Sequence, residues 1–242
     1  MIKVVPLKEG DFYEDEVKNF LPIGDKVLTT EIQLAVQPFL IITDNHKTLL
    51  DVGLGYQENG VYKIDELLAK EGLTPLDIDR VLMSHLHKDH INGLVEETEE
   101  GYIGRYPNAQ IYIQRREVAF AELSMDDISF DYDILEEALA LPNIIWMNDD
   151  QGSIDEQITY QVVGGHTPYM QVFWIKDKEQ TIFYGADNLP KHSYLEFNMA
   201  FKSDYDGKLA MKWRTEWKIQ AEAEHWTVLF YHDMERAVYS CE

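Results

Sequence analysis

The stretch MSHLHKDHINGL (Met83–Leu94) packs three histidines and an aspartate into six consecutive positions. In an extended segment residues i and i+2 point to the same side, so His85 and His87 are predicted to face one metal ion together. Asp89 and His90 follow after a change of chain direction and can reach a second, neighbouring position. Imidazole and carboxylate ligands without a thiolate suit Zn²⁺ or a nearby first-row metal such as iron, manganese or cobalt. The stretch therefore predicts a metal site.

The segments around this cluster alternate between apolar runs, which predict strands, and helical spacing. Strands are predicted at Ile32–Thr43 and Thr48–Val52 with a turn at Asp44–His46, in the run DIDRVLMSH that leads into the cluster, and at Gln110–Gln114, Ile144–Met147, Ile158–Val163, Gln171–Lys176, Thr181–Tyr184 and Trp226–Tyr231. Helices are predicted from about Lys63 to a stop at Gly72, near Arg116–Leu123 and Tyr132–Leu141, and from about Asp206 to Glu224. Grouped strands with both hairpins and helical crossovers predict an α/β fold in which two mixed β-sheets pack together with helices outside.

The composition narrows the class of partner. The 242 residues are 45% apolar and contain 44 acidic against 21 basic residues, a formal net charge of −23. We expect a single domain over residues 1–242, because no stretch reads as a linker or repeat. The acidic charge argues against nucleic acid and membranes as partners. The expected partner is a small-molecule substrate, and one that is neutral or cationic overall suits this field better unless bound metal inverts the potential locally. The sequence leaves the oligomeric state open, a homodimer included.

The cysteine content and the amino-terminal sequence bear on the compartment. The only cysteine, Cys241, cannot form an intrachain disulfide. The start of the chain does not resemble a signal peptide, and the apolar runs are shorter than a membrane span. A soluble cytoplasmic protein is the expectation.

Three further residues stand immediately after apolar runs, where strands end in loops and functional sites are often built. They are His166 in VVGGHTP, Asp187 in IFYGADNLP and His232 in LFYHD. This repeated placement makes them candidates to join the same site. His46 in a turn and His225 near a helix end are interpreted as structural.

Taken together, these motifs resemble those of the metallo-β-lactamase superfamily of metallo-hydrolases. The matching elements are H-x-H-x-D-H-x-x-G ending at Gly93, then G-H-T-P at 165–168, G-A-D at 185–187 and His232, in the order of the family. The resemblance implies a four-layer αββα sandwich with the metal site along one edge. It also implies that His85, His87 and His166 hold one metal.

The same resemblance assigns the second metal to Asp89, His90 and His232. Asp187 would bridge the two ions, and Asp51 in TLLDVG would orient a ligand imidazole. The implied cofactor is a pair of divalent ions, with zinc as the first choice and iron or manganese as alternatives.

Departures from other branches narrow the subfamily. The classical β-lactamases commonly carry cysteine where Asp187 stands, which argues against antibiotic hydrolysis as the native role. The diiron flavoprotein branch has an acidic residue where His87 stands, which argues for hydrolysis over oxygen reduction. The acidic surface argues against the nuclease branches, and we find no equivalent of the basic residues with which glyoxalase II enzymes grip glutathione.

The pattern is most similar to the lactonase-like branch, which includes N-acyl homoserine lactonases and related organophosphate hydrolases. Those lactonases place a tyrosine three residues after the bridging aspartate, whereas this chain has Pro190 there. His192 and Tyr194 are the candidates for a substrate-binding residue in its place.

The resemblance thus predicts a dinuclear metal-dependent hydrolase that uses a metal-bridging hydroxide on an ester, lactone or related small molecule. Asp89 is predicted to be catalytic, passing a proton to the leaving group. The alternatives are a phosphoester or phosphotriester hydrolase, an iron-dependent oxidoreductase on the same scaffold, and a metal-binding sensor without enzymatic activity.

Overall fold

The computed structural model describes residues 2–24 and 32–241, and its chain divides into two compact units. The first unit comprises the chain up to Ile113 together with Ala121–Trp146. The second unit comprises Gln114–Phe120 and the chain from Met147 onwards. None of the helices in the described part of the chain combines the length and apolar character that a bilayer-spanning helix requires.

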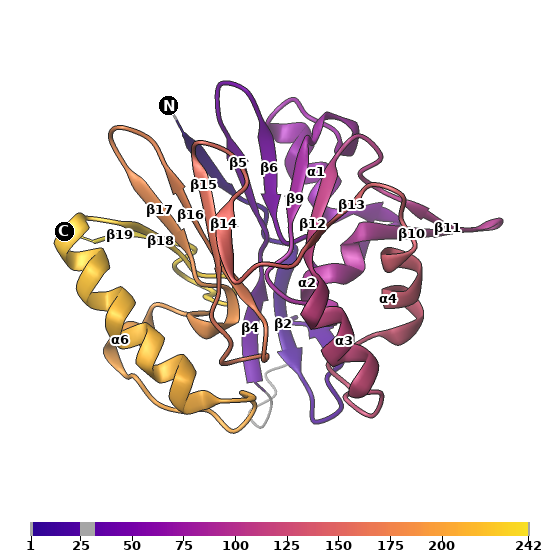
Figure 1. The fold of residues 1–242 in the computed structure, drawn as a ribbon. Coiled ribbons are helices and arrows are strands. Elements are labelled where there is room, and N and C mark those ends of the chain that lie inside the picture. Colours follow the sequence, from indigo (N-terminus) through magenta and orange to yellow (C-terminus); the bar gives the residue numbers. More distant parts are fainter. Residues whose placement is uncertain (1, 25–31, 242) are drawn as a thin grey trace. The chain divides into compact units, whose positions relative to one another are not determined.

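The first unit is built on a six-stranded mixed sheet (Figure 1). Its strands, in spatial order, are β1 (Lys3–Pro6), β5 (Phe39–Ile42), β6 (Lys47–Leu50), β9 (Arg80–Leu82), β12 (Gln110–Gln114) and β13 (Ile144–Met147). The central strand β9 runs parallel to both β6 and β12, and its residues Val81 and Leu82 are fully buried. Because carboxyl ends of parallel strands lie at one edge, the segments after β6 and β9 emerge side by side.

A second, three-stranded sheet of this unit has the order β3–β2–β4 and consists of β3 (Phe20–Pro22), β2 (Gly10–Glu14) and β4 (Ile32–Val36). The prediction of one strand over Ile32–Thr43 is therefore wrong. The chain passes at Gln37 and Pro38 from β4, which pairs with β2, to β5, which pairs with β1 and β6. Pro38 has no N–H to continue a ladder, and its carbonyl accepts from Leu7 instead.

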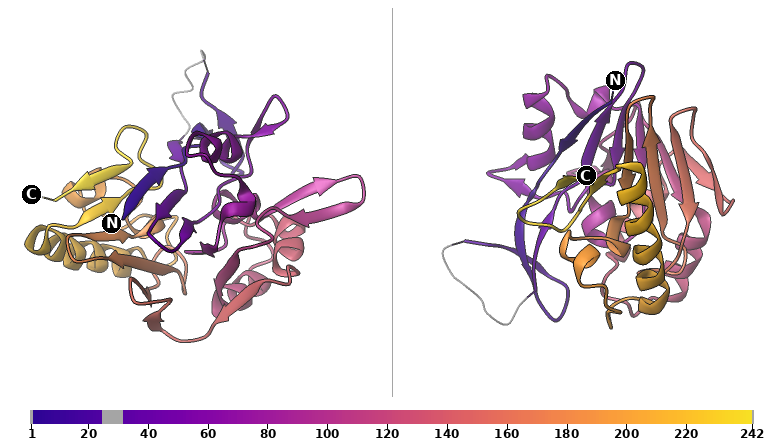
Figure 2. Two further views of the ribbon diagram at one scale, coloured as in Figure 1. Left: turned by 90° about the horizontal axis from the view of Figure 1, so that it is seen from above. Right: turned by 90° about the vertical axis from the view of Figure 1, so that its left-hand side faces the viewer.

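The remaining elements of the first unit are short. They are β7 (Gln57–Glu58), β8 (Val61–Tyr62), α1 (Lys63–Lys70), η1 (Pro75–Asp77), α2 (Lys88–Ile91), η2 (Asn92–Leu94), β10 (Val95–Thr98), β11 (Gly101–Gly104) and α4 (Tyr132–Leu139). Between β12 and α4 the chain forms α3 (Arg115–Leu123). The β10–β11 hairpin projects from the rest of this unit (Figure 2).

The second unit has its own six-stranded sheet. In spatial order, which is also chain order, the strands are β14 (Gln151–Ser153), β15 (Ile158–Val162), β16 (Gln171–Lys176), β17 (Thr181–Tyr184), β18 (Thr227–Leu229) and β19 (Val238–Ser240). The helical elements are η3 (Ala186–Asn188), α5 (Ser193–Glu196) and α6 (Gly207–Glu224). The long helix α6 lies along this sheet (Figures 1 and 2), where Trp217 packs on Phe183 with ring centroids 4.9 Å apart.

Most of the predicted elements are present within a residue or two. The turn at Asp44–His46 joins β5 and β6, and Gly72 ends the first helix with φ of +73°. The long helix begins at an aspartate cap, since the Asp206 side chain accepts from the backbone N–H of Leu209. Several short or edge strands were not predicted, among them β1, β14 and β19. These strands carry too few apolar residues for a periodic signal.

A buried carboxylate shapes the loop after β6. The Glu9 side chain, 2% exposed, accepts the backbone N–H groups of Leu54 at 2.7 Å and Tyr56 at 3.0 Å. Burial raises the pKa of Glu9 to about 8, although those two hydrogen bonds oppose the shift. Gly53 at the start of the loop has φ of +78°, and a Cβ there would lie 2.3 Å from Glu9 Oε2. Position 53 therefore requires glycine for two reasons: its left-handed backbone angle and the lack of space for a Cβ.

We expect Gly53→Ala to lower the free energy of unfolding by about 3 kcal/mol or more, since it adds a steric clash to left-handed strain. Gly60 provides the matched control because its φ is +79° and a Cβ there meets nothing within 4 Å. Gly60→Ala should cost only the strain, about 1 kcal/mol. Denaturant unfolding of both variants measures the difference. Equal losses would mean that the Glu9 side chain yields to the methyl group.

Candidate metal centre

The histidine cluster follows directly from the position of β9. At the carboxyl end of this strand the backbone N–H of Met83 still bonds the carbonyl of Tyr112 on β12, and the chain then leaves the sheet. His87 keeps an extended conformation with φ of −65° and ψ of 149°, and the next four residues turn into α2. The predicted change of direction after the second histidine is thus observed.

Four polar side chains converge at this strand end in the first unit. The ring of His85 lies 4.6 Å from that of His87 and 4.1 Å from that of His90, measured between centroids. The His90 Nε2 atom is 3.7 Å from Asp89 Oδ2. All but the half-buried His87 are buried. Three imidazoles and a carboxylate this close suit a cation far better than they suit an apolar core.

Asp51 and Ser84 fix the orientation of two of these imidazoles. Asp51 lies fully buried at the end of β6, and its Oδ2 is 2.8 Å from His90 Nδ1 and accepts the hydroxyl of Ser84 at 2.6 Å. The Ser84 hydroxyl in turn lies 3.0 Å from His85 Nδ1. Because the Nδ1 atoms are held from behind, the Nε2 atoms are left to face a ligand. Asp51 has φ of +56°, a strained angle for aspartate that places it at this contact.

Gly93, the last residue of the motif, lets two loops of this unit touch. A Cβ at this position would lie 2.0 Å from the carbonyl oxygen of Val52, so only glycine fits. The backbone N–H of Gly93 donates to the carbonyl of Gly53, and that of Val52 donates to His90. Glycine at this position therefore allows the close backbone approach behind the histidines.

The second unit brings together His166, Asp187 and His232. Strand β17 runs parallel to β18 and, through the antiparallel β16, in the same direction as β15. The loops after these three strands therefore leave the same edge of the sheet. Asp187 Oδ2 lies 3.4 Å from His166 Nε2, and Asp187 Oδ1 lies 3.1 Å from His232 Nε2. One carboxylate thus faces two imidazoles, and the three residues placed after apolar runs lie together in this unit.

His166 is positioned by two residues that were not predicted from the sequence. Asp204 Oδ1 lies 3.0 Å from His166 Nδ1, so this carboxylate holds the ring as Asp51 holds that of His90. The Asn188 side chain accepts the backbone N–H of His166 at 2.8 Å and donates to the carbonyl of Gly164 at 2.6 Å. The only sequence feature that could have indicated a role for Asn188 is that it directly follows Asp187. Asp204 is 38 residues away from His166 in the chain, and no sequence feature indicates its role.

Two buried charged side chains support these loops. Arg214 on α6 is 1% exposed and donates to the carbonyl of Asn188 at 2.9 Å and to the Asn198 side chain at 2.8 Å. Glu117 accepts the hydroxyl of Thr167 at 2.6 Å and the backbone N–H of Tyr169 at 2.7 Å. Burial raises the pKa of Glu117 to about 7, opposed by these hydrogen bonds. The loop that carries His166 is therefore fixed on both sides.

The structure gives the two candidate substrate residues different surroundings within the second unit. The His192 ring lies 4.5 Å from that of Tyr239, and its Nε2 is 3.2 Å from an Arg236 nitrogen. Tyr194 instead stacks on Phe201 at 4.4 Å, and its pKa is raised to about 12 by burial and by the charges of Asp187 and Asp204. Tyr194 is thus the one with electrostatic contact to a predicted ligand. A substrate-binding role for either residue stays a prediction.

The donor set fits the predicted cofactor. All seven predicted ligands belong to groups of histidine and aspartate side chains that could hold a metal ion; they are His85, His87, Asp89, His90, His166, Asp187 and His232. At least one imidazole of each unit has its Nδ1 held by a buried carboxylate, an arrangement typical of metal-binding histidine.

We expect Asp51→Asn to weaken metal binding by about 10- to 100-fold, the usual effect of losing a carboxylate behind a ligand histidine. The amide would present N–H groups where the His90 Nδ1–H and the Ser84 hydroxyl now donate. Asp77→Asn is the matched control, because Asp77 likewise accepts an N–H and a hydroxyl, both from Thr74, but in an exposed turn. Metal affinity is measured by competition with a chromophoric chelator. Equal affinities in both variants would remove the orienting role.

Comparison with known proteins identifies the family. The sequence profile of the metallo-beta-lactamase superfamily matches residues 33–232, and the chain belongs to this superfamily. The match includes every predicted ligand. The prediction that the chain is an enzyme of this metallo-hydrolase class is confirmed at the level of the family.

The chain is similar to lactonases and to a probable metal-dependent hydrolase. An N-acyl homoserine lactonase, AttM of Azorhizobium caulinodans, is 44% identical over 50 residues, which span 21% of this chain and 16% of the lactonase. A probable metal-dependent hydrolase from Staphylococcus aureus has a TM-score of 0.80 at 20% identity, covering 99% of this chain and 92% of that one. The dizinc quorum-quenching lactonase AidC, in complex with a homoserine product, has a TM-score of 0.76 at 20% identity, covering 98% and 89%. These structures confirm the predicted α/β metallo-β-lactamase fold.

Proposed function

We propose that this protein is a dinuclear metal-dependent hydrolase that acts on a lactone, an ester or a related small molecule, with residues 1–242 forming one hydrolase domain. The observation that carries the proposal is the pair of imidazole–carboxylate groups described above, one at a sheet edge of each unit. The ligand set of the sequence analysis stands within this proposal: His85, His87 and His166 for one ion, Asp89, His90 and His232 for the other, and Asp187 as the bridge.

The bound ions would supply a polarised substrate carbonyl and a water whose pKa is lowered towards about 7. The chain itself contributes orientation and proton transfer. Asp51 and Asp204 keep the Nδ1 atoms of His90 and His166 engaged, so that the ligand atoms are pre-positioned. Asp89 is the carboxylate proposed to carry a proton to the leaving group, which suits its place in the first turn of α2 beside His90.

Lactones are the substrate class that the comparisons favour. The 50-residue match to an N-acyl homoserine lactonase supports this choice, as does the lactonase-like motif pattern. One departure is Pro190 in place of the lactonase tyrosine. The Pro190 carbonyl accepts the backbone N–H of His232, so this position has a structural task here. Tyr194 is our candidate for the substrate-facing hydroxyl, because the charge of Asp187 contributes to the raised pKa of its phenol.

The test is a hydrolysis screen of the zinc- and manganese-loaded protein over lactones, aryl esters, phosphodiesters and phosphotriesters. The proposal expects turnover of lactones or esters. If only phosphoesters are turned over, the proposed metal site is retained and the proposed substrate class is replaced by phosphoesters. Iron as the only bound metal, with visible absorption that changes on reduction, would favour the oxidoreductase alternative. No turnover in any class would leave metal binding without hydrolysis, the sensor alternative.

A further inference from the structure

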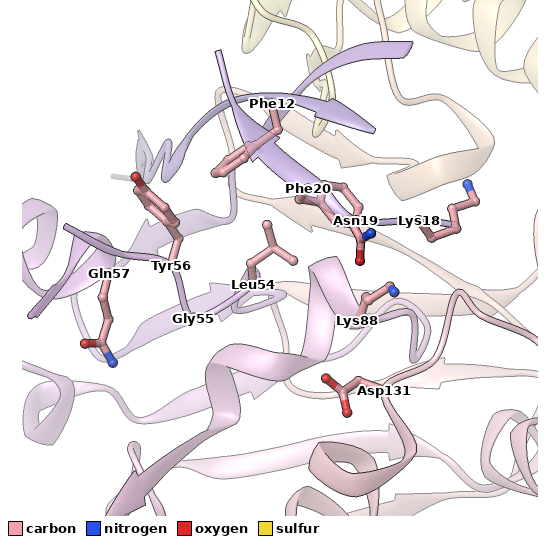
Figure 3. Close-up of a pocket in the computed structure, with 10 residues that line it drawn as sticks. All are labelled: Phe12, Lys18, Asn19, Phe20, Leu54, Gly55, Tyr56, Gln57, Lys88 and Asp131. Atoms are coloured by element: carbon pink, nitrogen blue, oxygen red, sulfur yellow. The ribbon is translucent and has the colours of Figure 1, made fainter. Parts of the chain in front are cut away.

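A pocket of about 490 Å³ opens in the first unit, and Lys88, from within the histidine-rich motif, is one of its lining residues (Figure 3). Its volume lies within the range of small-molecule sites, about 300–1,000 Å³. Phe12, Phe20 and Leu54 face one another along one side of it (Figure 3). The Phe12 ring also meets Tyr56 edge to face at 5.3 Å. Such walls suit an aromatic ring or a short apolar chain.

The pocket also has polar and charged lining residues. Lys18, Lys88 and Asp131 line it, and Asp15 is close enough for the Lys88 charge to influence its pKa. A pocket with both signs of charge has no obvious ligand preference. The preference depends on which of these charges already has a partner inside the protein.

Three of the four charges are engaged. Lys18 forms an ion pair with Glu14. Asp131 caps α4 by accepting the N–H of Ile134, and also accepts from the Asn92 side chain at 3.2 Å. The Asp15 carboxylate accepts three hydrogen bonds, from the backbone of Val17 and from the backbone and side chain of Asn19. These contacts satisfy the two carboxylates and the first lysine.

Lys88 is the exception. Its ammonium group forms no ion pair or hydrogen bond with any residue in the described ranges 2–24 and 32–241. The side chain is half-buried and stands between Asn19 and Asp131, whereas Lys18 extends away (Figure 3). A long cationic side chain held at a pocket wall with no ion pair or hydrogen bond to the described residues is available to an anionic ligand.

The backbone fixes Lys88 close to the predicted chemistry. Lys88 is the x between His87 and Asp89 in the metal motif, and its own N–H donates to the carbonyl of Ser129 at 2.9 Å. The residue proposed to bind the ligand group is therefore the direct sequence neighbour of His87 and Asp89, two proposed metal ligands. With a formal charge of −23, the protein repels anions in general, so a local cation is what an anionic substrate would require.

We infer that this pocket selects substrates that combine an apolar ring or chain with a carboxylate, and that Lys88 binds the carboxylate. The inference rests on the proposed hydrolase function and names a substrate class within it. The apolar part lies against Phe12, Phe20 and Leu54, and the carboxylate pairs with the ammonium. Lys88 is thus a specificity-determining residue that takes no part in bond cleavage.

The kinetic test compares two phenyl esters on the metal-loaded protein, monophenyl glutarate with a free carboxylate and phenyl valerate without one. We expect Lys88→Met to raise KM for monophenyl glutarate about tenfold or more relative to KM for phenyl valerate. Lys88→Arg should retain most of the affinity, because it keeps the charge. Lys70→Met at the end of α1 removes the same charge outside the pocket and should behave as the parent.

A binding measurement separates failure of this inference from failure of the proposed function. Calorimetric titration of the full chain with 4-phenylbutyrate should show binding that weakens with added salt and is lost in Lys88→Met. If neither these esters nor the lactones of the screen are hydrolysed but this binding persists, the hydrolase proposal fails and the carboxylate pocket stands. If Lys88→Met and the parent bind 4-phenylbutyrate equally and process both esters alike, the inference is overturned.

Discussion

Removal of metal with a chelator is expected to abolish hydrolysis, and added Zn²⁺, Mn²⁺ or Co²⁺ is expected to restore it. The physical reason is the site itself, whose imidazole and carboxylate groups are arranged around a cation. Without the ions, nothing in the site would polarise the substrate carbonyl or lower the pKa of the attacking water.

The same experiment has readouts beside activity. Metal that binds only the folded chain stabilises it by about 4 kcal/mol at a thousandfold excess over its dissociation constant, so the metal-free protein should unfold at a lower temperature. Re-addition of metal should release protons, because histidine ligands must be neutral to bind. Metal content is measured alongside by atomic emission. Full activity in protein shown to be free of metal would contradict the proposed function.

The sequence predicted the ligand candidates because each lies at a recognisable boundary. The cluster at His85–His90, the loop residue His166 and Asp187 each follow an apolar run, and such runs are the strongest local signal of a strand. What a strand end does not reveal is its neighbour in space. The order of β17 and β18, parallel and adjacent, is what brings Asp187 to His232, and 42 residues with a long helix separate those two strands in the chain.

The supporting residues were the part that could not be predicted. Asp204, Glu117 and Arg214 are ordinary residues in sequence, without periodic spacing or adjacency to a motif. Their importance arises from burial, which only the fold determines. Glu117 is 1% exposed and Arg214 is 1% exposed, although charged residues usually stay at the surface. Each is retained inside because it satisfies the backbone or side-chain groups of the loops that carry His166 and Asp187.

The proposed binding role of Lys88 could not be predicted from the sequence either. In the sequence it is the variable residue of the motif, and a solvent-exposed lysine is the usual interpretation. Only the pairing of the surrounding charges, with Lys18 engaged by Glu14 and Asp131 by Asn92, leaves its ammonium as the available group. The motif therefore locates the chemistry, whereas the neighbouring contacts suggest the substrate.

Asp89→Asn should lower kcat by about 10²- to 10⁴-fold, out of proportion to any loss of metal. Asparagine keeps the size of the side chain and still offers a carbonyl oxygen, but it cannot accept or carry a proton near neutral pH. The loss should shrink for substrates with good leaving groups, which depart without protonation. The measurement is metal stoichiometry together with kcat over an ester series of graded leaving-group pKa.

The control for this variant must remove one negative charge from the start of a helix without removing the proposed proton carrier. Asp133→Asn does so, because Asp133 also lies in the first turn of a helix, α4, but is exposed. Both changes remove one negative charge near a helix amino terminus, an effect worth only about 0.3–1 kcal/mol. Asp133→Asn should therefore leave kcat unchanged. If Asp89→Asn retains both metals and near-normal turnover of the poor leaving groups, Asp89 acts as a ligand alone, and the proton must reach the leaving group from another residue.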